Sequence, residues 1–196
     1  MKVLGLTGSV GMGKSTAAAA LRRMGIPVHD ADREVHRLLG RGGAAVAAVA
    51  KAFPGVARDG VVDRRELGRR VFSDAAGLAR LEAILHPLVR AAEGRFLARC
   101  RRRRRPIAVL DIPLLLETGD AGRCDAVFVV SAPRRVQLAR VLGRPGMTEA
   151  RLRGVEARQM PDGEKRRLAD VVIPTGLNRR FSLDRLRRAV RRFSGR

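Results

Sequence analysis

Aromatic side chains are scarce in this chain of 196 residues, which contains no Trp, no Tyr and only six Phe. Proteins that bind single-stranded nucleic acid commonly stack the bases on aromatic rings. We therefore expect no specific nucleic-acid partner, although a net charge of +22 and a pI near 11.8 would by themselves suit one. The same charge is compatible with an acidic membrane surface or with small polyanionic substrates.

Cysteines and long apolar runs are also scarce. Cys100 and Cys124 lie far apart and form no C-x-x-C, so the sequence indicates neither a zinc site nor a disulfide framework. No run approaches the ~18 apolar residues of a membrane span, and the chain opens on a strand pattern without a cationic leader. We expect a cytoplasmic protein with no membrane partner, and no pattern specifies an oligomeric state.

Lysine is rare beside arginine and occurs only at Lys2, Lys14, Lys51 and Lys165. Lys14 belongs to Gly8-Ser-Val-Gly-Met-Gly-Lys-Ser15, which matches the phosphate-binding loop G-x-x-x-x-G-K-[ST] between an apolar run and a helix-forming segment. In such a loop, backbone N–H groups and a helix N-terminus bind phosphates. The motif predicts that Lys14 contacts the β- and γ-phosphates of a nucleoside triphosphate and that Ser15 binds Mg²⁺.

Short apolar runs alternate with helical patterns along the chain. This alternation predicts an α/β fold with a parallel sheet of five strands flanked by helices. The expected strands cover residues 3–6, 27–29, 107–110, 126–130 and 171–173. The expected helices flanking them cover residues 15–24, 133–142 and 181–193.

Strand patterns stop between residues 44 and 105, where Phe53-Pro-Gly55 and Asp59-Gly60 interrupt helical patterns. We interpret 44–105 as a helical insertion into a single domain, whose core is formed by residues 1–43, 106–143 and 168–196. A polar segment at 144–167 is interpreted as a mobile lid. The five arginines at 101–105 are interpreted as the solvated end of a helix, because five consecutive side chains cannot share one face.

Carboxylates follow two of the predicted strands, where ligands gather in open α/β sheets. Asp111 follows the strand at 107–110, and Asp30 and Asp32 follow the strand at 27–29. Both positions suit a carboxylate that helps to organise Mg²⁺ beside the loop. Asp is equally favoured as a helix cap or in a turn, so the residues alone leave both interpretations open.

A series of further motifs follows the loop in a fixed order along nearly the whole chain. They are D-A-D at 30–32, G-V-V-D-R-R-E-L at 60–67, L-E-A-I-L-H-P at 81–87, D-I-P-L-L-L-E at 111–117, Arg158-Gln159 and A-D-V-V-I at 169–173. In this order the chain resembles the dephospho-CoA kinase family. Many P-loop kinases share the phosphate-binding loop, whereas the ordered combination of motifs is specific to that family.

The resemblance implies transfer of the γ-phosphoryl group of ATP to the ribose 3′-hydroxyl of dephospho-CoA, with Mg²⁺, in the last step of coenzyme A synthesis. The implied catalytic residues are Lys14, Asp32, Arg140 and Arg158, with Asp32 as the base for the acceptor hydroxyl. The implied ATP-binding residues are Gly8, Gly11, Met12, Gly13, Lys14, Ser15, Thr16 and Arg144. The resemblance also makes the helical insertion at 44–105 an acceptor-binding one. The implied acceptor-binding residues are Asp32, His86, Pro87, Leu114 and Glu117, and Ser15 and Asp111 are the implied metal ligands.

Some features leave alternatives open. The family commonly has an Asn-containing turn after A-D-x-V-I, where this chain has Pro174-Thr-Gly176, so an adenine contact from that turn is not carried over. His86 before Pro87 also fits a helix boundary. The alternative functions are another small-molecule P-loop kinase, of the nucleoside monophosphate or shikimate type, and a basic nucleic-acid-binding P-loop protein. The motifs at 81–87 and 111–117 favour a dephospho-CoA kinase over another small-molecule P-loop kinase.

Overall fold

The chain forms two compact units, which the computed structural model describes over residues 1–72 and 74–194. One unit combines Met1–His29 with Cys100–Arg196, and the other is Asp30–Arg99. The second unit begins before the insertion predicted at 44–105, because Leu38 and Leu39 pack in its apolar core. The division of the chain by function into core, insertion and lid stays a prediction.

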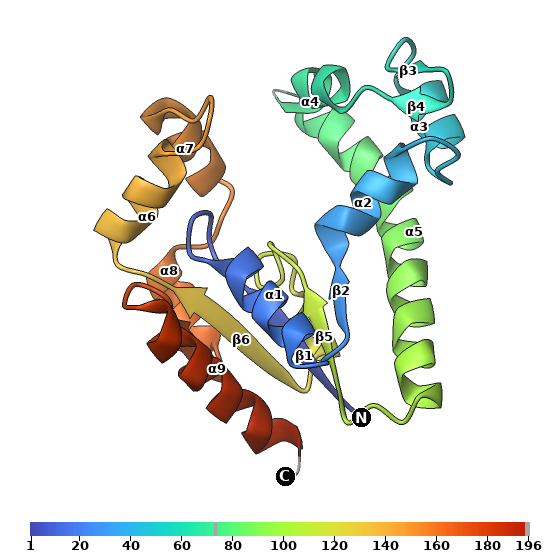
Figure 1. Ribbon diagram of the computed structural model, residues 1–196. Helices are drawn as coiled ribbons and strands as arrows, with labels where there is room; N and C mark the ends of the chain where they lie inside the picture. Colours follow the sequence, from blue (N-terminus) through green and yellow to red (C-terminus); the bar gives the residue numbers. More distant parts are fainter. Residues whose placement is uncertain (73, 195–196) are drawn as a thin grey trace. The chain divides into compact units, whose positions relative to one another are not determined.

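The first unit is built on a parallel sheet of five strands in the order β2-β5-β1-β6-β7 (Figure 1). The strands are β1 (Lys2–Thr7), β2 (Val28–Asp30), β5 (Ile107–Asp111), β6 (Ala126–Ser131) and β7 (Val171–Pro174). Every residue of β5 and β6 is buried, as expected for a parallel sheet covered on both faces. The predicted sheet is confirmed, and each strand end lies within one residue of its predicted position.

The first unit also contains helices, and some of them cover the faces of the sheet together with the segment after β5. The helices are α1 (Lys14–Arg23), α6 (Arg134–Leu142), α7 (Glu149–Glu156), α8 (Asp162–Leu168) and α9 (Arg179–Ser194), with a 3-10 turn at Asp120–Arg123. α1 and α9 share an apolar core with one face, where Phe128 of β6 meets Phe193 of α9 edge to face with ring centroids 5.6 Å apart. Leu115 packs with Val129 on the opposite face.

The second unit consists of helices around a separate core. Its elements are α2 (Ala31–Leu39), α3 (Val46–Ala52), β3 (Ala57–Arg58), β4 (Val61–Val62), α4 (Arg64–Phe72) and α5 (Ala75–Arg102), the last of which continues into the first unit. The β3–β4 hairpin was not predicted. Asp59 and Gly60 form its turn with φ of 50° and 73°, the left-handed conformation that a two-residue hairpin turn requires.

The helix boundary considered at His86 is wrong, because Pro87 lies inside the 28-residue helix α5. A proline in a helix removes one backbone hydrogen bond. Here Leu81 and Leu85 remain buried in the core of the unit, and this packing holds the helix together through the proline. The helix ends at Arg102 and residues 101–105 are all exposed, which confirms the interpretation of the arginine run as a solvated helix end.

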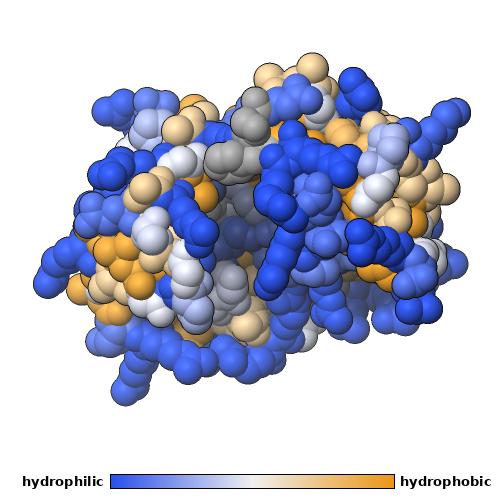
Figure 2. Space-filling view, turned by 90° about the horizontal axis from the view of Figure 1, so that it is seen from above, coloured by the Kyte–Doolittle hydropathy of each residue, from blue (hydrophilic) through white to orange (hydrophobic). Residues whose placement is uncertain are grey.

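Hydrophilic side chains cover most of the face seen in Figure 2, with smaller hydrophobic areas among them. This distribution agrees with a composition in which 31% of the residues are charged. Across residues 1–72 and 74–194, no helix is both long enough and apolar enough to cross a membrane.

Candidate nucleotide-binding site

Residues 8–13 form a loop between β1 and α1, as the motif predicts. Gly13 caps α1 with φ of 90°, a conformation that side chains other than glycine rarely adopt. A Cβ atom on Gly8 would lie 2.7 Å from the backbone oxygen of Val130, so only glycine allows the loop to approach β6 this closely. The predicted ATP-binding residues from Gly8 to Thr16 therefore all lie on this loop and the first turn of α1.

Met12 contributes to the loop differently from its neighbours. Its side chain is 3% exposed, and its Sδ accepts a hydrogen bond from the Ala132 amide at 3.1 Å. A side chain packed in this way anchors the loop to the end of β6.

Lys14 and Asp111 form an ion pair at the centre of the predicted site. The Lys14 Nζ donates to Asp111 Oδ1 at 2.7 Å, and the two side chains are 16% and 3% exposed. Asp111 is the last residue of β5, which pairs with β1, so the sheet brings this carboxylate to the loop. Ser15 is exposed in the first turn of α1, next to Lys14 in the chain.

Arg140 and Thr175 hold the loop from the side of α6 and β7. Arg140 donates to the carbonyl oxygens of Gly11 at 3.3 Å and Thr175 at 2.6 Å. The Thr175 hydroxyl donates to the Met12 carbonyl at 2.6 Å. The turn at 174–176, where the chain departs from the family pattern, thus bonds the phosphate-binding loop itself.

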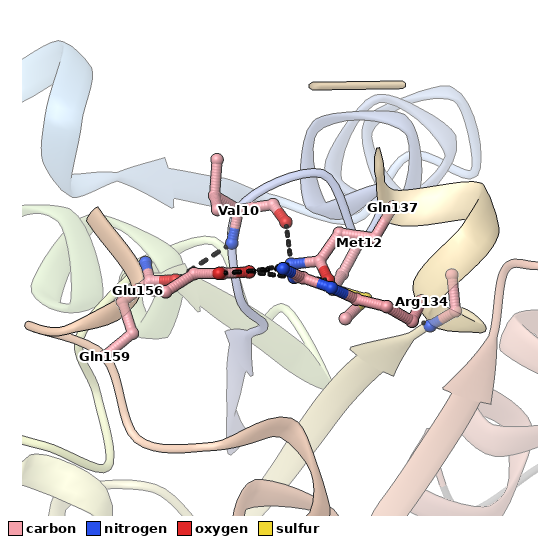
Figure 3. A network of polar contacts seen from close by, with 7 residues as sticks. Val10, Met12, Arg134, Gln137, Glu156 and Gln159 are labelled. Carbon is pink, nitrogen blue, oxygen red and sulfur yellow. Dashed lines mark hydrogen bonds and ion pairs between the residues drawn. The ribbon is translucent and has the colours of Figure 1, made fainter. Parts of the chain in front are cut away.

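Val10, at the tip of the loop, is bonded through both its backbone groups (Figure 3). Its amide donates to Gln159 Oε1 at 3.0 Å, and its carbonyl accepts from Gln137 Nε2 at 2.9 Å. Gln137 also bonds Arg134 and Glu156, which form an ion pair with each other. These side chains line a cavity of about 380 Å³ beside the loop.

The three predicted arginines occupy different surroundings. Arg140 reaches the loop, whereas Arg144 is exposed after the end of α6 and Arg158 is exposed after the end of α7. A contact of Arg144 or Arg158 with phosphate stays a prediction.

Three of the predicted acceptor residues belong to the unit Asp30–Arg99. Asp30 caps α2 by accepting the Arg33 amide at 3.0 Å, as the helix-cap interpretation requires. Asp32 lies exposed in the first turn of the same helix, and His86 and Pro87 are exposed on α5. Within D-A-D, the cap is therefore Asp30, and Asp32 is the carboxylate that remains accessible.

The other two predicted acceptor residues, Leu114 and Glu117, follow β5 in the first unit. Leu114 is half-buried. Glu117 Oε1 accepts the Met160 amide at 2.9 Å and lies 2.7 Å from Nζ of Lys165, which is fully buried in α8. The Lys165–Glu117 contact is an ion pair by distance, although its angles are not those of a hydrogen bond. Glu117 thus anchors α8, and its acceptor role stays a prediction.

Comparison with known proteins identifies the family. The sequence profile of the dephospho-CoA kinase family matches residues 2–178. The chain belongs to the dephospho-CoA kinase family. A dephospho-CoA kinase from Paramagnetospirillum magneticum is 69% identical over 85% of this chain and 78% of its own length. One from Rhodospirillum rubrum is 58% identical over 94% of this chain and 88% of its own.

Solved structures agree with this dephospho-CoA kinase assignment at the level of the fold. A crystal structure from Thermus thermophilus is 38% identical, with a TM-score of 0.86 over 96% of this chain and 95% of its own. A shikimate kinase from Acinetobacter baumannii shares the fold at 17% identity, with a TM-score of 0.53 over 100% of this chain and 94% of its own. The resemblance predicted from the motifs is confirmed.

Residues of this family member that sequence reasoning missed include Gln137, Thr175 and Lys165. No periodic pattern marks a side chain that bonds a loop more than a hundred positions away, as Gln137 and Thr175 do. A signal did exist for Lys165, since it is one of only four lysines in an arginine-rich chain.

Proposed function

We propose that this chain transfers the γ-phosphoryl group of ATP to the ribose 3′-hydroxyl of dephospho-CoA, which gives coenzyme A and ADP. The observation that carries the proposal is a phosphate-binding loop with Lys14 beside Asp111, in a chain that matches the dephospho-CoA kinase family over residues 2–178. Family membership selects the acceptor, and the loop supplies the chemistry of phosphoryl transfer.

In the proposed reaction, the 3′-oxygen forms a bond to the γ-phosphorus while the bond from that phosphorus to the β–γ bridging oxygen breaks. ADP leaves with the bridging electron pair, and the hydroxyl proton passes to the carboxylate of Asp32. Asp32 is exposed just after the carboxyl end of β2, where ligands gather in open α/β sheets. Its contribution is that of a general base, on the order of 10²–10⁴-fold.

The loop stabilises the charge that spreads over the transferred phosphoryl group. Lys14 contacts the β- and γ-phosphates, and arginines 140, 144 and 158 lie on α6 or in the proposed lid at 144–167. Lys14 pairs with Asp111 at 2.7 Å, and its ammonium group has three donors, so Lys14 can contact phosphate oxygens beside that carboxylate. A cation is then needed to offset the repulsion between the Asp111 carboxylate and the phosphates.

Mg²⁺ with ATP fits that requirement. No group of three or more His, Cys, Asp and Glu in residues 1–72 and 74–194 is arranged to hold a metal ion. A single carboxylate and a hydroxyl, from Asp111 and Ser15, are the hard oxygen ligands that suit Mg²⁺ when phosphates and water complete its shell. When bound, the ion neutralises charge on the β- and γ-phosphate oxygens.

The acceptor is proposed to contact His86 and Pro87 on α5 and Leu114 and Glu117 after β5. The proposed insertion at 44–105 supplies the α5 residues. The cytoplasm is the proposed location, since ATP is available there.

The test is acceptor-dependent ADP release. The protein is incubated with Mg·ATP and, separately, dephospho-CoA, AMP, UMP, shikimate or RNA. Among these acceptors, we expect only dephospho-CoA to stimulate ADP release. The product should carry the new phosphate on the ribose 3′-oxygen. Turnover with AMP, UMP or shikimate instead would show another small-molecule kinase. Salt-sensitive RNA binding without acceptor-stimulated turnover would show a nucleic-acid-binding protein.

The variant Lys14→Ala provides the matched inactive protein for this assay. It removes a charged contact to the transferred group, so we expect turnover to fall by ~10²-fold or more. Turnover that persists in Lys14→Ala would come from a contaminating kinase or from a site elsewhere in the chain.

A further inference from the structure

The only two glutamines in the chain both bond Val10, the residue at the tip of the phosphate-binding loop. Gln137 lies on α6 and Gln159 follows α7, so they are separated from Val10 by 127 and 149 positions. Figure 3 shows the two side chains approaching Val10 from different elements. We call Val10, Gln137 and Gln159 the tip clamp.

The backbone of Val10 fixes which end of each amide faces it. An N–H group needs an acceptor, so Gln159 presents its oxygen, and a carbonyl needs a donor, so Gln137 presents its nitrogen. The usual ambiguity between the oxygen and nitrogen of a glutamine is therefore resolved by chemistry. The two glutamines make opposite contacts, and the same substitution has opposite consequences at the two positions.

Neighbouring side chains hold the Gln137 end of the clamp rigid. Gln137 is 3% exposed, its oxygen accepts from Arg134 at 2.7 Å, and its nitrogen also donates to Glu156 at 3.1 Å. Hydrogen bonding to Glu156 raises the pKa of the Arg134 guanidinium, which stays protonated. Glu156 ends α7, three positions before Gln159, so one segment supports both halves of the clamp.

We propose that Gln137 and Gln159 are positioning residues for nucleotide binding. The loop contains glycines at positions 8, 11 and 13, and such a chain loses much conformational freedom when it closes around phosphates. A tip that is already bonded on both sides loses less conformational entropy when nucleotide binds. This smaller loss strengthens binding. The proposal rests on the proposed function only in that this loop binds ATP.

The test compares three variants by calorimetric titration with Mg·ADP. Gln137→Glu replaces the donor by a carboxylate oxygen that faces the Val10 carbonyl and Glu156, so we expect affinity to fall about tenfold. Gln159→Leu removes the acceptor of the Val10 amide and should weaken affinity about three- to tenfold. Gln159→Glu keeps an acceptor oxygen and should restore affinity to within about threefold of the parent.

Kinetics and a control separate positioning from general damage. We expect Gln137→Glu and Gln159→Leu to raise KM for ATP and to leave KM for dephospho-CoA unchanged. Glu149→Gln changes the charge of an exposed pair on the same helix α7 and should leave Mg·ADP affinity unchanged. Gln159 is half-buried, so its two variants test the proposal even if Gln137→Glu fails to fold.

Three results would overturn the proposal. They are equal losses of Mg·ADP affinity in Gln137→Glu and Gln159→Glu, an unchanged affinity in Gln159→Leu, and tighter binding of Mg·ADP in any of these variants. Titration with Mg·ADP needs no acceptor. A clamp effect in a protein that does not phosphorylate dephospho-CoA would therefore contradict the proposed function and leave the positioning role intact.

Discussion

Two of the four lysines, Lys14 and Lys165, form ion pairs with carboxylates at low exposure. Lysine carries a compact charge on a flexible stem, whereas the planar arginine head needs space for several donors. Asp111 and Glu117 each present one oxygen at 2.7 Å to these ammonium groups. At these two positions, lysine therefore supplies a small point charge where there is little room.

The first residue to test is Asp32, the proposed base. Asp32→Asn keeps the size of the side chain and removes the proton acceptor, so we expect kcat for dephospho-CoA phosphorylation to fall by ~10²-fold or more. Affinity for Mg·ATP should change little, because Asp32 lies on α2 and not on the phosphate-binding loop. Steady-state kinetics and calorimetry measure the two quantities.

Glu34→Gln is the matched control, because it removes another carboxylate from the first turn of α2, one that pairs with Arg37. Its kcat should stay near that of the parent. A near-normal kcat in Asp32→Asn would contradict the assignment and direct attention to Asp111.

At the scale of elements, the Lys165–Glu117 pair joins α8 to the segment after β5. Lys165→Met removes the cation and leaves Glu117 without its charge partner at low exposure, so we expect the free energy of unfolding to fall by about 3–5 kcal/mol. The double variant Lys165→Met/Glu117→Gln should recover much of this loss, since Gln still accepts the Met160 amide. Urea unfolding measures both. A double variant as unstable as the single one would show that packing, and not charge, holds α8.

The arginines of the proposed lid and those at the end of α5 should differ in function. Arg158→Ala should lower kcat by up to ~10³-fold if its guanidinium reaches the transferred phosphate, with smaller losses for Arg140→Ala and Arg144→Ala. Replacing three of the five arginines at 101–105 by Gln should keep kcat within about threefold, because these residues are exposed and lie in no motif.

The run variant should mainly reduce retention of the protein on RNA at low salt. Loss of kinase activity in the run variant, with activity kept in all three lid variants, would mean that residues 101–105 belong to the acceptor site.

Elements were predictable where the signal is local. The strands at 107–110 and 126–130 are short runs of Val, Ile, Leu and Phe, and the sheet buries them as predicted. The helix boundary considered at His86 was wrong because the preference of a residue before proline for a non-helical conformation is a local rule. Packing of the surrounding turns decides whether a long helix continues through a proline. The β3–β4 hairpin was missed although Asp59-Gly60 is a favourable hairpin turn, because its strands are only two residues long.

At the scale of the whole molecule, stability should fall in acid. The Val3 amide lowers the pKa of Asp125, and the Glu66 amide lowers the pKa of Asp63. A carboxyl with a lowered pKa in the folded state stabilises it above the unfolded value near 4, and that stabilisation is lost as pH falls through the folded value. Protonation also increases a positive charge that is already +22, which adds repulsion.

Thermal unfolding at pH 7 and pH 3 measures this effect. We expect a lower Tm at pH 3, partly restored by salt. Asp125→Asn should have a lower Tm than the parent at pH 7 and a smaller further decrease on acidification. A variant with the same decrease as the parent would show that the Asp125 carboxylate does not contribute.

The candidate site, like the fold, was predictable only where its residues are close together in the sequence. The loop at 8–15 is contiguous, so its residues could be named from sequence, and Asp111 followed from the end of β5. The clamp at Val10 and the bond from Thr175 to Met12 join residues more than a hundred positions apart, and only the folded chain brings them together. Position in the fold also showed Glu117 to be bonded to α8 through Lys165.

The Lys14–Asp111 pair also affects which anions the loop accepts. The Lys14 ammonium has three donors and uses one of them for Asp111 at 2.7 Å, so the others are available to phosphate oxygens. A nucleotide that carries its own cation would offset the repulsion between its phosphates and the Asp111 carboxylate, whereas a bare phosphate or sulfate ion would not. We therefore expect the loop to bind metal-complexed nucleotide more tightly than a small free anion.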